Sequence, residues 1–185
     1  MKEQENKIEK ALSLYDYSMS DETVRAAVKK IIAEHVHEND TPEVKKFLMG
    51  SVELTTLKTT DSEESVMAFT ERVNQFDDTY PDIPHVATIC VYPNFAKTVA
   101  DTLEVEGVEI ACVSGSFPSS QTFTEIKIAE TALAIKDGAT EIDMVANIGA
   151  ILDGNWFDVR KDISAVKQML ESIQPNRFIL KVIVE

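Results

Sequence analysis

Residues 141–146 read Glu-Ile-Asp-Met-Val-Ala, and this short run decides the fold expected for the chain. Its side chains alternate, so that Glu141 and Asp143 share one face while Ile142 and Met144 share the other. A polar face on a strand inside an α/β layer must point to a site, to solvent or to partners that satisfy it. In a barrel that face points inward, and its carboxyl end opens into the active site. An edge strand with one wet face is the alternative.

Outward from this run, four more short apolar runs alternate with segments of helical periodicity. The alternation is typical of repeated βα units and a parallel sheet. The runs are Val52–Leu57, Val86–Tyr92, Glu109–Val113 and Phe178–Glu185, and the helical segments are Ser62–Phe76, Phe95–Glu106, Phe123–Asp137 and Phe157–Ile173.

Two architectures fit this pattern, a doubly wound open sheet and a (β/α)₈ barrel. Polar residues gather at the strand ends, and no glycine-rich phosphate loop follows a strand, which favours the barrel. A complete barrel takes about 250 residues. We therefore expect residues 51–185 to form a partial TIM barrel of about five βα units, ending at an apolar strand that nothing covers.

The helix signals in the first 50 residues predict a helical extension that precedes the barrel. Ser20 can cap one helix, and the Thr41-Pro42-Glu43 sequence predicts the start of a second helix that Gly50 closes. The extension could cap the floor of the barrel or make a contact in a homo-oligomer. The apolar face of the first helix comprises Val24, Val28, Ile31 and Ile32.

Composition limits the function classes. The 32 acidic and 18 basic residues give a net charge of −14, which argues against a nucleic-acid or anionic-membrane surface. The two cysteines, Cys90 and Cys112, lie in apolar runs, so we expect both to be reduced and to lie in the core. Met1–Lys10 is charged and lacks the apolar segment of a signal peptide, and no run approaches the roughly 20 residues of a membrane span. We expect a cytoplasmic location.

Lys181 is the strongest candidate for chemistry. Alternation places Ile179, Lys181 and Ile183 on one face of the last strand. Burial among β-branched residues would lower the pKa of the lysine and free its amine to attack a carbonyl. A lysine that extends to solvent or pairs with a carboxylate is the alternative. With Asp143 on a neighbouring strand, Lys181 would make the amine and proton-transfer pair of Schiff-base aldol chemistry.

Four motifs, in order and at matching spacing, resemble the deoxyribose-phosphate aldolases, a family of Schiff-base aldolases with a TIM-barrel fold. The resemblance covers residues 51–185. Its motifs are Leu54-Thr55-Thr56-Leu57, Ala87-Thr88-Ile89-Cys90-Val91-Tyr92-Pro93, Gly138-Ala139-Thr140-Glu141-Ile142-Asp143-Met144-Val145 with Asn147-Ile148-Gly149-Ala150, and Leu180-Lys181-Val182-Ile183-Val184-Glu185.

This resemblance implies a lyase that reversibly cleaves 2-deoxy-D-ribose 5-phosphate to acetaldehyde and D-glyceraldehyde 3-phosphate, in deoxyribonucleotide catabolism, with no metal or organic cofactor. Lys181 would carry the imine and Asp143 the proton relay. Cys90 and Thr55 match positions at or near the substrate pocket, although Cys90 also fits the role of a core residue. The isolated His35 and His37, two apart on a helix, do not predict a metal site.

The chain also departs from the family pattern. Glu53 stands where an Asp often precedes the first Leu, and Ser114-Gly115-Ser116 is unusual before Phe117-Pro118. The second essential lysine and the phosphate loops of the family follow the strand of Lys181 and have no counterpart in the chain. We therefore expect little or no aldolase activity from this chain alone. A half-barrel that acts only as a binding or assembly module, or another Schiff-base aldolase, are the alternatives.

Overall fold

The structure is a computed structural model that describes residues 10, 13–16 and 18–184. The expectations for residues 1–9 and for Glu185 lie outside this part of the chain. The chain divides into two compact units, the first ending at Lys45 and the second beginning at Lys46. The division into 1–50 and 51–185 that the sequence suggests stays a prediction.

The first unit contains α2 (Asp21–Asn39), which begins where the sequence predicts. The side chain of Ser20 accepts a hydrogen bond from the backbone N–H of Thr23 and so caps the helix. The next helix, α3 (Pro42–Met49), begins at the predicted proline. The apolar side chains of α2 that the periodicity places on one face are exposed, namely Val24, Val28, Ile31 and Ile32.

The second unit is built on a five-stranded sheet in which every strand is parallel to the next and the order follows the sequence. A doubly wound sheet would reverse its strand order at a switch point, whereas a barrel adds its strands consecutively. The predicted partial barrel is therefore confirmed. The strands are β1 (Glu53–Thr55), β2 (Thr88–Val91), β3 (Glu109–Ser114), β4 (Glu141–Val145) and β5 (Ile179–Ile183).

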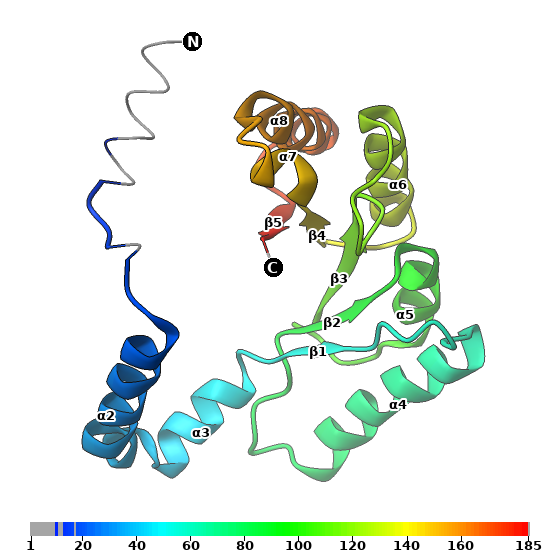
Figure 1. The fold of residues 1–185 in the computed structure, drawn as a ribbon. Coiled ribbons are helices and arrows are strands. Elements are labelled where there is room, and N and C mark those ends of the chain that lie inside the picture. The colour runs from blue at the N-terminus through cyan, green and yellow to red at the C-terminus, as the bar shows by residue number, and fades with distance from the viewer. Residues whose placement is uncertain (1–9, 11–12, 17, 185) are drawn as a thin grey trace. The chain divides into compact units, whose positions relative to one another are not determined.

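Helices connect successive strands and lie along one side of the sheet (Figure 1). Four of them match the predicted helical segments, although α5 (Ala96–Thr102) ends before the predicted Glu106, because the backbone becomes extended at Leu103. A 3₁₀ turn, η1, precedes α5 and includes Phe95. The sequence did not predict the five-residue helix α7, which Asn147 caps. The helices are α4 (Glu63–Thr79), α5 (Ala96–Thr102), α6 (Thr124–Lys136), α7 (Ile148–Leu152) and α8 (Trp156–Ile173), with η1 at Pro93–Phe95.

The sheet has a different environment on each face. Alternate strand residues such as Ile89, Ile142 and Met144 pack against the helices in the main hydrophobic core. The residues between them point to the inner face, where Cys90, Ala111 and Val113 form a smaller apolar cluster. Both cysteines are buried and free. In the described part of the chain, no helix is both long and apolar enough to cross a bilayer.

Candidate active site

Lys181 and Asp143 lie directly opposite each other on neighbouring strands. In the register of β4 and β5, Asp143 pairs with Lys181, so both side chains project from the inner face of the sheet. The Lys181 Nζ lies 3.0 Å from the Asp143 Oδ1. The structure thus brings together the two residues that the sequence singled out as the amine and proton-transfer pair.

Two further carboxylates contact the same lysine. Glu53 of β1 forms an ion pair with Lys181, and the Glu141 Oε2 lies 3.0 Å from the Lys181 Nζ. Glu141 shares the face of Asp143, so the alternation in β4 was a signal for it. No local signal marked Glu53 as a partner, because it lies on the first strand of the sheet and Lys181 on the last. One ammonium group therefore meets three carboxylates.

These contacts overturn one expectation about Lys181. Its side chain is 39% exposed, so it is only partly withdrawn from water. Partial burial acts to lower the pKa of the lysine, but the hydrogen bond from the ammonium group to Glu53 and its ion pairs with Asp143 and Glu141 outweigh it and raise the pKa above its ordinary value. The prediction of a lowered pKa was wrong, because the surrounding carboxylates stabilise the charged form.

The environment of Asp143 favours the neutral form of its side chain, whereas that of Lys181 favours the charged form. The residue is only 7% exposed, and burial together with the neighbouring Glu53 carboxylate raises its pKa to about 6, against the opposing effect of Lys181. The pKa of Glu53 is lowered, because its contacts with Lys181, Asp143 and Thr88 outweigh its partial burial. A carboxyl group that titrates near neutral pH beside an amine is suited to proton transfer.

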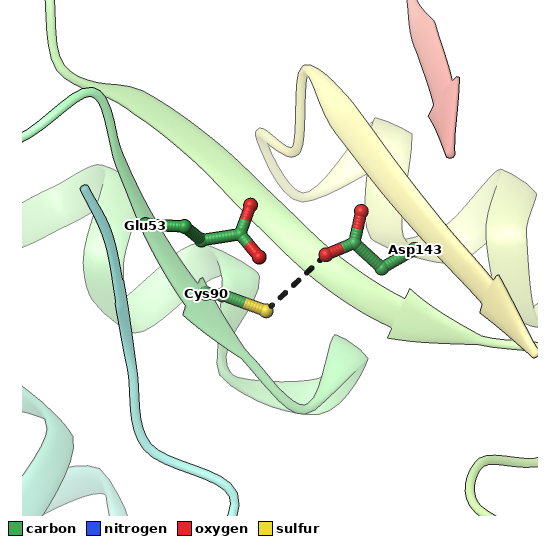
Figure 2. Close-up of side chains that lie close together, drawn as sticks. All are labelled: Glu53, Cys90 and Asp143. Carbon is green, nitrogen blue, oxygen red and sulfur yellow. Dashed lines mark hydrogen bonds between the residues drawn. The ribbon is translucent and has the colours of Figure 1, made fainter. Parts of the chain in front are cut away.

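Cys90 lies beside the two carboxylates on the inner face of β2. Its Sγ donates a long hydrogen bond of 3.8 Å to the Asp143 Oδ2, and Figure 2 shows the thiol and the side chains of Glu53 and Asp143 turned toward one another. Burial, with the charges of Glu53 and Asp143, raises the pKa of Cys90 to about 12, so the thiol stays neutral. The structure places Cys90 in the site, and its role in substrate binding stays a prediction.

Thr55 is the remaining predicted site residue. It pairs with Cys90 in the register of β1 and β2 and so belongs to the same face. Its side chain is exposed, and its Oγ1 donates to the backbone carbonyl of Glu53 at 3.3 Å. This bond is local to β1, and contact of Thr55 with a substrate stays a prediction.

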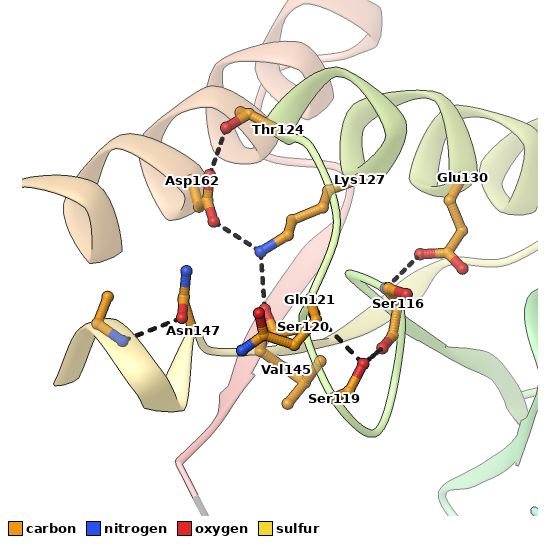
Figure 3. A network of polar contacts seen from close by, with 11 residues as sticks. Ser116, Ser119, Ser120, Gln121, Thr124, Lys127, Glu130, Val145, Asn147 and Asp162 are labelled. Carbon is orange, nitrogen blue, oxygen red and sulfur yellow. Dashed lines mark hydrogen bonds and ion pairs between the residues drawn. The ribbon is translucent and has the colours of Figure 1, made fainter. Parts of the chain in front are cut away.

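A buried polar network, which the sequence did not indicate, lies next to the site and is drawn in Figure 3. Lys127 of α6 is fully buried, and its Nζ lies 2.6 Å from the Asp162 Oδ2 of α8 and 2.7 Å from the Ser120 Oγ. Ser120, in the loop after β3, donates to the backbone carbonyl of Val145 at 3.2 Å. The network thus joins this loop to the end of β4, two residues beyond Asp143. Isoleucines flank Lys127 in the sequence, and nothing local indicates its partner.

No protein-family model matches the chain. Curated proteins named deoxyribose-phosphate aldolase do match it. The protein of Bacillus cereus (strain B4264) is 36% identical over 134 residues, which are 72% of this chain and 54% of that protein. The protein of Aciduliprofundum boonei is 42% identical over 97 residues, which are 52% of this chain and 42% of that protein. The chain spans about half the length of the curated relatives it matches.

Two solved structures share the fold. An aldolase designated QR15 is 25% identical, with a TM-score of 0.62 over 74% of this chain and 55% of that one. The deoxyribose phosphate aldolase of Aeropyrum pernix, described as a tetramer, is 22% identical, with a TM-score of 0.61 over 76% of this chain and 53% of that one.

Proposed function

Because this chain is a homologue of the deoxyribose-phosphate aldolases, matching about half of their length, we propose that it carries the Schiff-base centre of such an enzyme. The reaction is the reversible aldol cleavage of 2-deoxy-D-ribose 5-phosphate to acetaldehyde and D-glyceraldehyde 3-phosphate, in deoxyribonucleotide catabolism. The observation that carries the proposal is the distance of 3.0 Å between the Lys181 Nζ and the Asp143 Oδ1 on the inner face of a parallel sheet.

The two residues divide the chemistry between them. The neutral amine of Lys181 adds to the aldehyde carbon, and loss of water gives an iminium that accepts electrons from the breaking carbon–carbon bond. Asp143 relays protons to and from the carbinolamine and the hydroxyl that becomes the aldehyde of the second product. Cleavage leaves an enamine on Lys181, which takes up a proton at its terminal carbon to become an imine. Hydrolysis of this imine then releases acetaldehyde and restores the amine.

Borohydride trapping tests this assignment. The chain is incubated with acetaldehyde and borohydride, and the adduct is located by peptide mass spectrometry. We expect a reduced two-carbon adduct on Lys181 that Lys181→Met removes. Lys161→Met is the matched control, because Lys161 is an exposed lysine of α8, and it should leave the adduct unchanged. Absence of an adduct on Lys181 at neutral and alkaline pH would contradict the proposal.

A second candidate function is a half-barrel that acts only as a binding or assembly module. It is favoured by the raised pKa of Lys181, since an ammonium group held by three carboxylates cannot attack a carbonyl. The same trapping experiment separates the two functions. Another Schiff-base aldolase would also give the adduct, and retro-aldol assays with 2-deoxy-D-ribose 5-phosphate and with other sugar phosphates distinguish it.

A further inference from the structure

The inner face of the sheet holds three side chains whose donor atoms converge. A carboxylate oxygen of Glu53, the Sγ of Cys90 and a carboxylate oxygen of Asp143 all lie within 4.8 Å of one another. They come from three strands, β1, β2 and β4, so the backbone of the sheet fixes their positions. In Figure 2 all three side chains point into the same space. Two carboxylates and a thiol make a mixed oxygen and sulfur donor set.

The site also has more negative than positive charge. Glu53, Glu141 and Asp143 contribute three carboxylates, and the ammonium group that contacts them is that of Lys181. The Asp143 Oδ1 is buried and accepts no hydrogen bond, although the Lys181 Nζ lies 3.0 Å away as an ion pair. A buried carboxylate oxygen with no hydrogen bond is unusual, because its desolvation is then poorly compensated. A divalent cation would compensate it better.

We propose that Glu53, Cys90 and Asp143 form a binding site for a divalent cation that accepts sulfur and oxygen ligands, of the Zn²⁺ class, and that this cation competes with the Lys181 ammonium group. Zn²⁺ binds thiolates and carboxylates in tetrahedral geometry, with bonds of about 2.3 Å to sulfur and about 2.0–2.2 Å to oxygen. Donor atoms in such a site are about 3.5 Å apart by this geometry.

The present geometry is close to these requirements. The Cys90 Sγ and the Asp143 Oδ2 are 3.8 Å apart, so modest side-chain rotations would bring the donors together. Binding would release the thiol proton to solvent and move the Lys181 ammonium group away from Glu53 and Asp143. Glu141 remains as a carboxylate partner for the displaced lysine. Binding of the cation does not depend on the proposed function, whereas its expected interference with imine formation does.

Cadmium provides a probe with a direct readout. Cd²⁺ is added to the chain, and the ultraviolet charge-transfer absorption of a cadmium–thiolate bond is recorded as a function of Cd²⁺ concentration. We expect a saturable signal that Cys90→Ser abolishes. Cys112→Ser is the matched control, because Cys112 is also buried but lies in the core on the helix side of the sheet, and it should keep the signal. Circular dichroism checks that each variant is folded.

Two further variants make the test specific. Asp143→Asn should weaken Cd²⁺ binding by at least about tenfold, because loss of a ligand should cost no less than loss of a group that only hydrogen-bonds to a ligand. Lys181→Met should tighten it, because the competing ammonium group is gone. The proposal is overturned if the wild type and Lys181→Met both lack the thiolate signal, or if Cys112→Ser removes it. A wild type that binds Cd²⁺ through Cys90 but forms no imine adduct with acetaldehyde would support this site and contradict the aldolase proposal, so the two can fail separately.

Discussion

At the scale of single residues, the charge around Lys181 sets what the site can do. The Lys181 ammonium group contacts three carboxylates, one of which belongs to the largely buried Asp143. The carboxylates raise the pKa of the lysine, although the neutral amine is the form that attacks a carbonyl. Removing one negative charge should therefore favour the reactive form.

The Glu53→Gln variant tests whether removing a negative charge beside Lys181 favours its neutral amine. Neutralising Glu53 should lower the pKa of Lys181, so that imine trapping with acetaldehyde reaches half of its maximal rate at a lower pH, by on the order of one unit. The measurement is the rate of borohydride trapping from neutral to alkaline pH. Glu106→Gln, at an exposed acidic residue after α5, is the control. Identical pH profiles for wild type and Glu53→Gln would show that Glu53 does not control the amine.

The stability of the Asp143→Asn variant should differ from that of the wild type in a way that depends on pH. The carboxyl group has a pKa of about 6 in the folded chain against an ordinary value of 3.8, so the folded state binds its proton more tightly than the unfolded state. Its contribution to stability is therefore greatest below pH 3.8 and is lost as the pH rises toward 6. We expect Asp143→Asn to raise the melting temperature relative to wild type at pH 7 and to lose this advantage at pH 4. A variant that melts below wild type at pH 7 contradicts this prediction.

The sequence could place Lys181 and Asp143 but not their electrostatics. Alternation in β4 and β5 is a local property, and it gives the face on which each side chain lies. The direction of the lysine pKa depends on Glu53, which is far away in the sequence and reaches Lys181 only once the sheet has curved. The buried Lys127 escaped prediction for the same reason, since Asp162 is its partner only in the folded chain.

At the scale of elements, the Lys127 network ties α6, α8 and the loop after β3 together. Lys127 is fully buried, and the side chain of Asp162 is 10% exposed, so both charges are withdrawn from water. Thr124 of α6 also donates to the Asp162 Oδ1 at 2.5 Å. Removing one member of a buried ion pair leaves the other charge uncompensated. The network should therefore be sensitive to single substitutions.

Lys127→Met should lower the free energy of unfolding by about 3–5 kcal/mol, because the Asp162 carboxylate is left buried without its partner. Urea denaturation followed by circular dichroism measures the change. Lys97→Met breaks an exposed pair with Asp101 and should cost less than about 1 kcal/mol. The double variant Lys127→Met, Asp162→Leu should recover part of the loss. Equal effects of Lys127→Met and Lys97→Met would refute the assigned role of the network.

Prediction of elements from the sequence succeeded where a periodic pattern was long enough. All five strands and the helices α4, α6 and α8 fall within a few residues of their predicted ranges. The five residues of α7 (Ile148–Leu152) complete little more than one helical turn, and one of them is Gly149, so no periodicity marks the helix. The predicted helix Phe95–Glu106 is shorter in the structure because the backbone becomes extended at Leu103 and α5 ends at Thr102.

At the scale of the whole molecule, the two outer strands of the sheet differ from the inner strands in how many neighbours they pair with. In the described sheet, β1 and β5 each pair with one neighbour, whereas β2, β3 and β4 each pair with two. The outer strand β5 also carries Ile179, which is 52% exposed, and Val184 follows it at 66% exposed. An edge strand with exposed apolar residues is a template for pairing with another chain.

We expect the 185-residue chain to self-associate as its concentration rises, which sedimentation velocity can measure. Ile179→Lys should shift the distribution toward the monomer, because a charged residue on an edge strand opposes pairing. Leu133→Lys is the control, since Leu133 is an exposed apolar residue of α6 and lies away from the edge. A wild type that stays monomeric at all concentrations contradicts this prediction.

The consecutive order of the strands also has a consequence for how the sheet forms. Within the described sheet, each strand pairs with the strand of the next βα unit, so none of these four pairings waits for a distant part of the chain. The entropy lost in closing each loop is then that of a short segment. A chain emerging from the ribosome can add its strands one at a time, from the amino end onward. In the finished sheet, amide hydrogens of β3 should exchange with solvent last and those of β1 and β5 first.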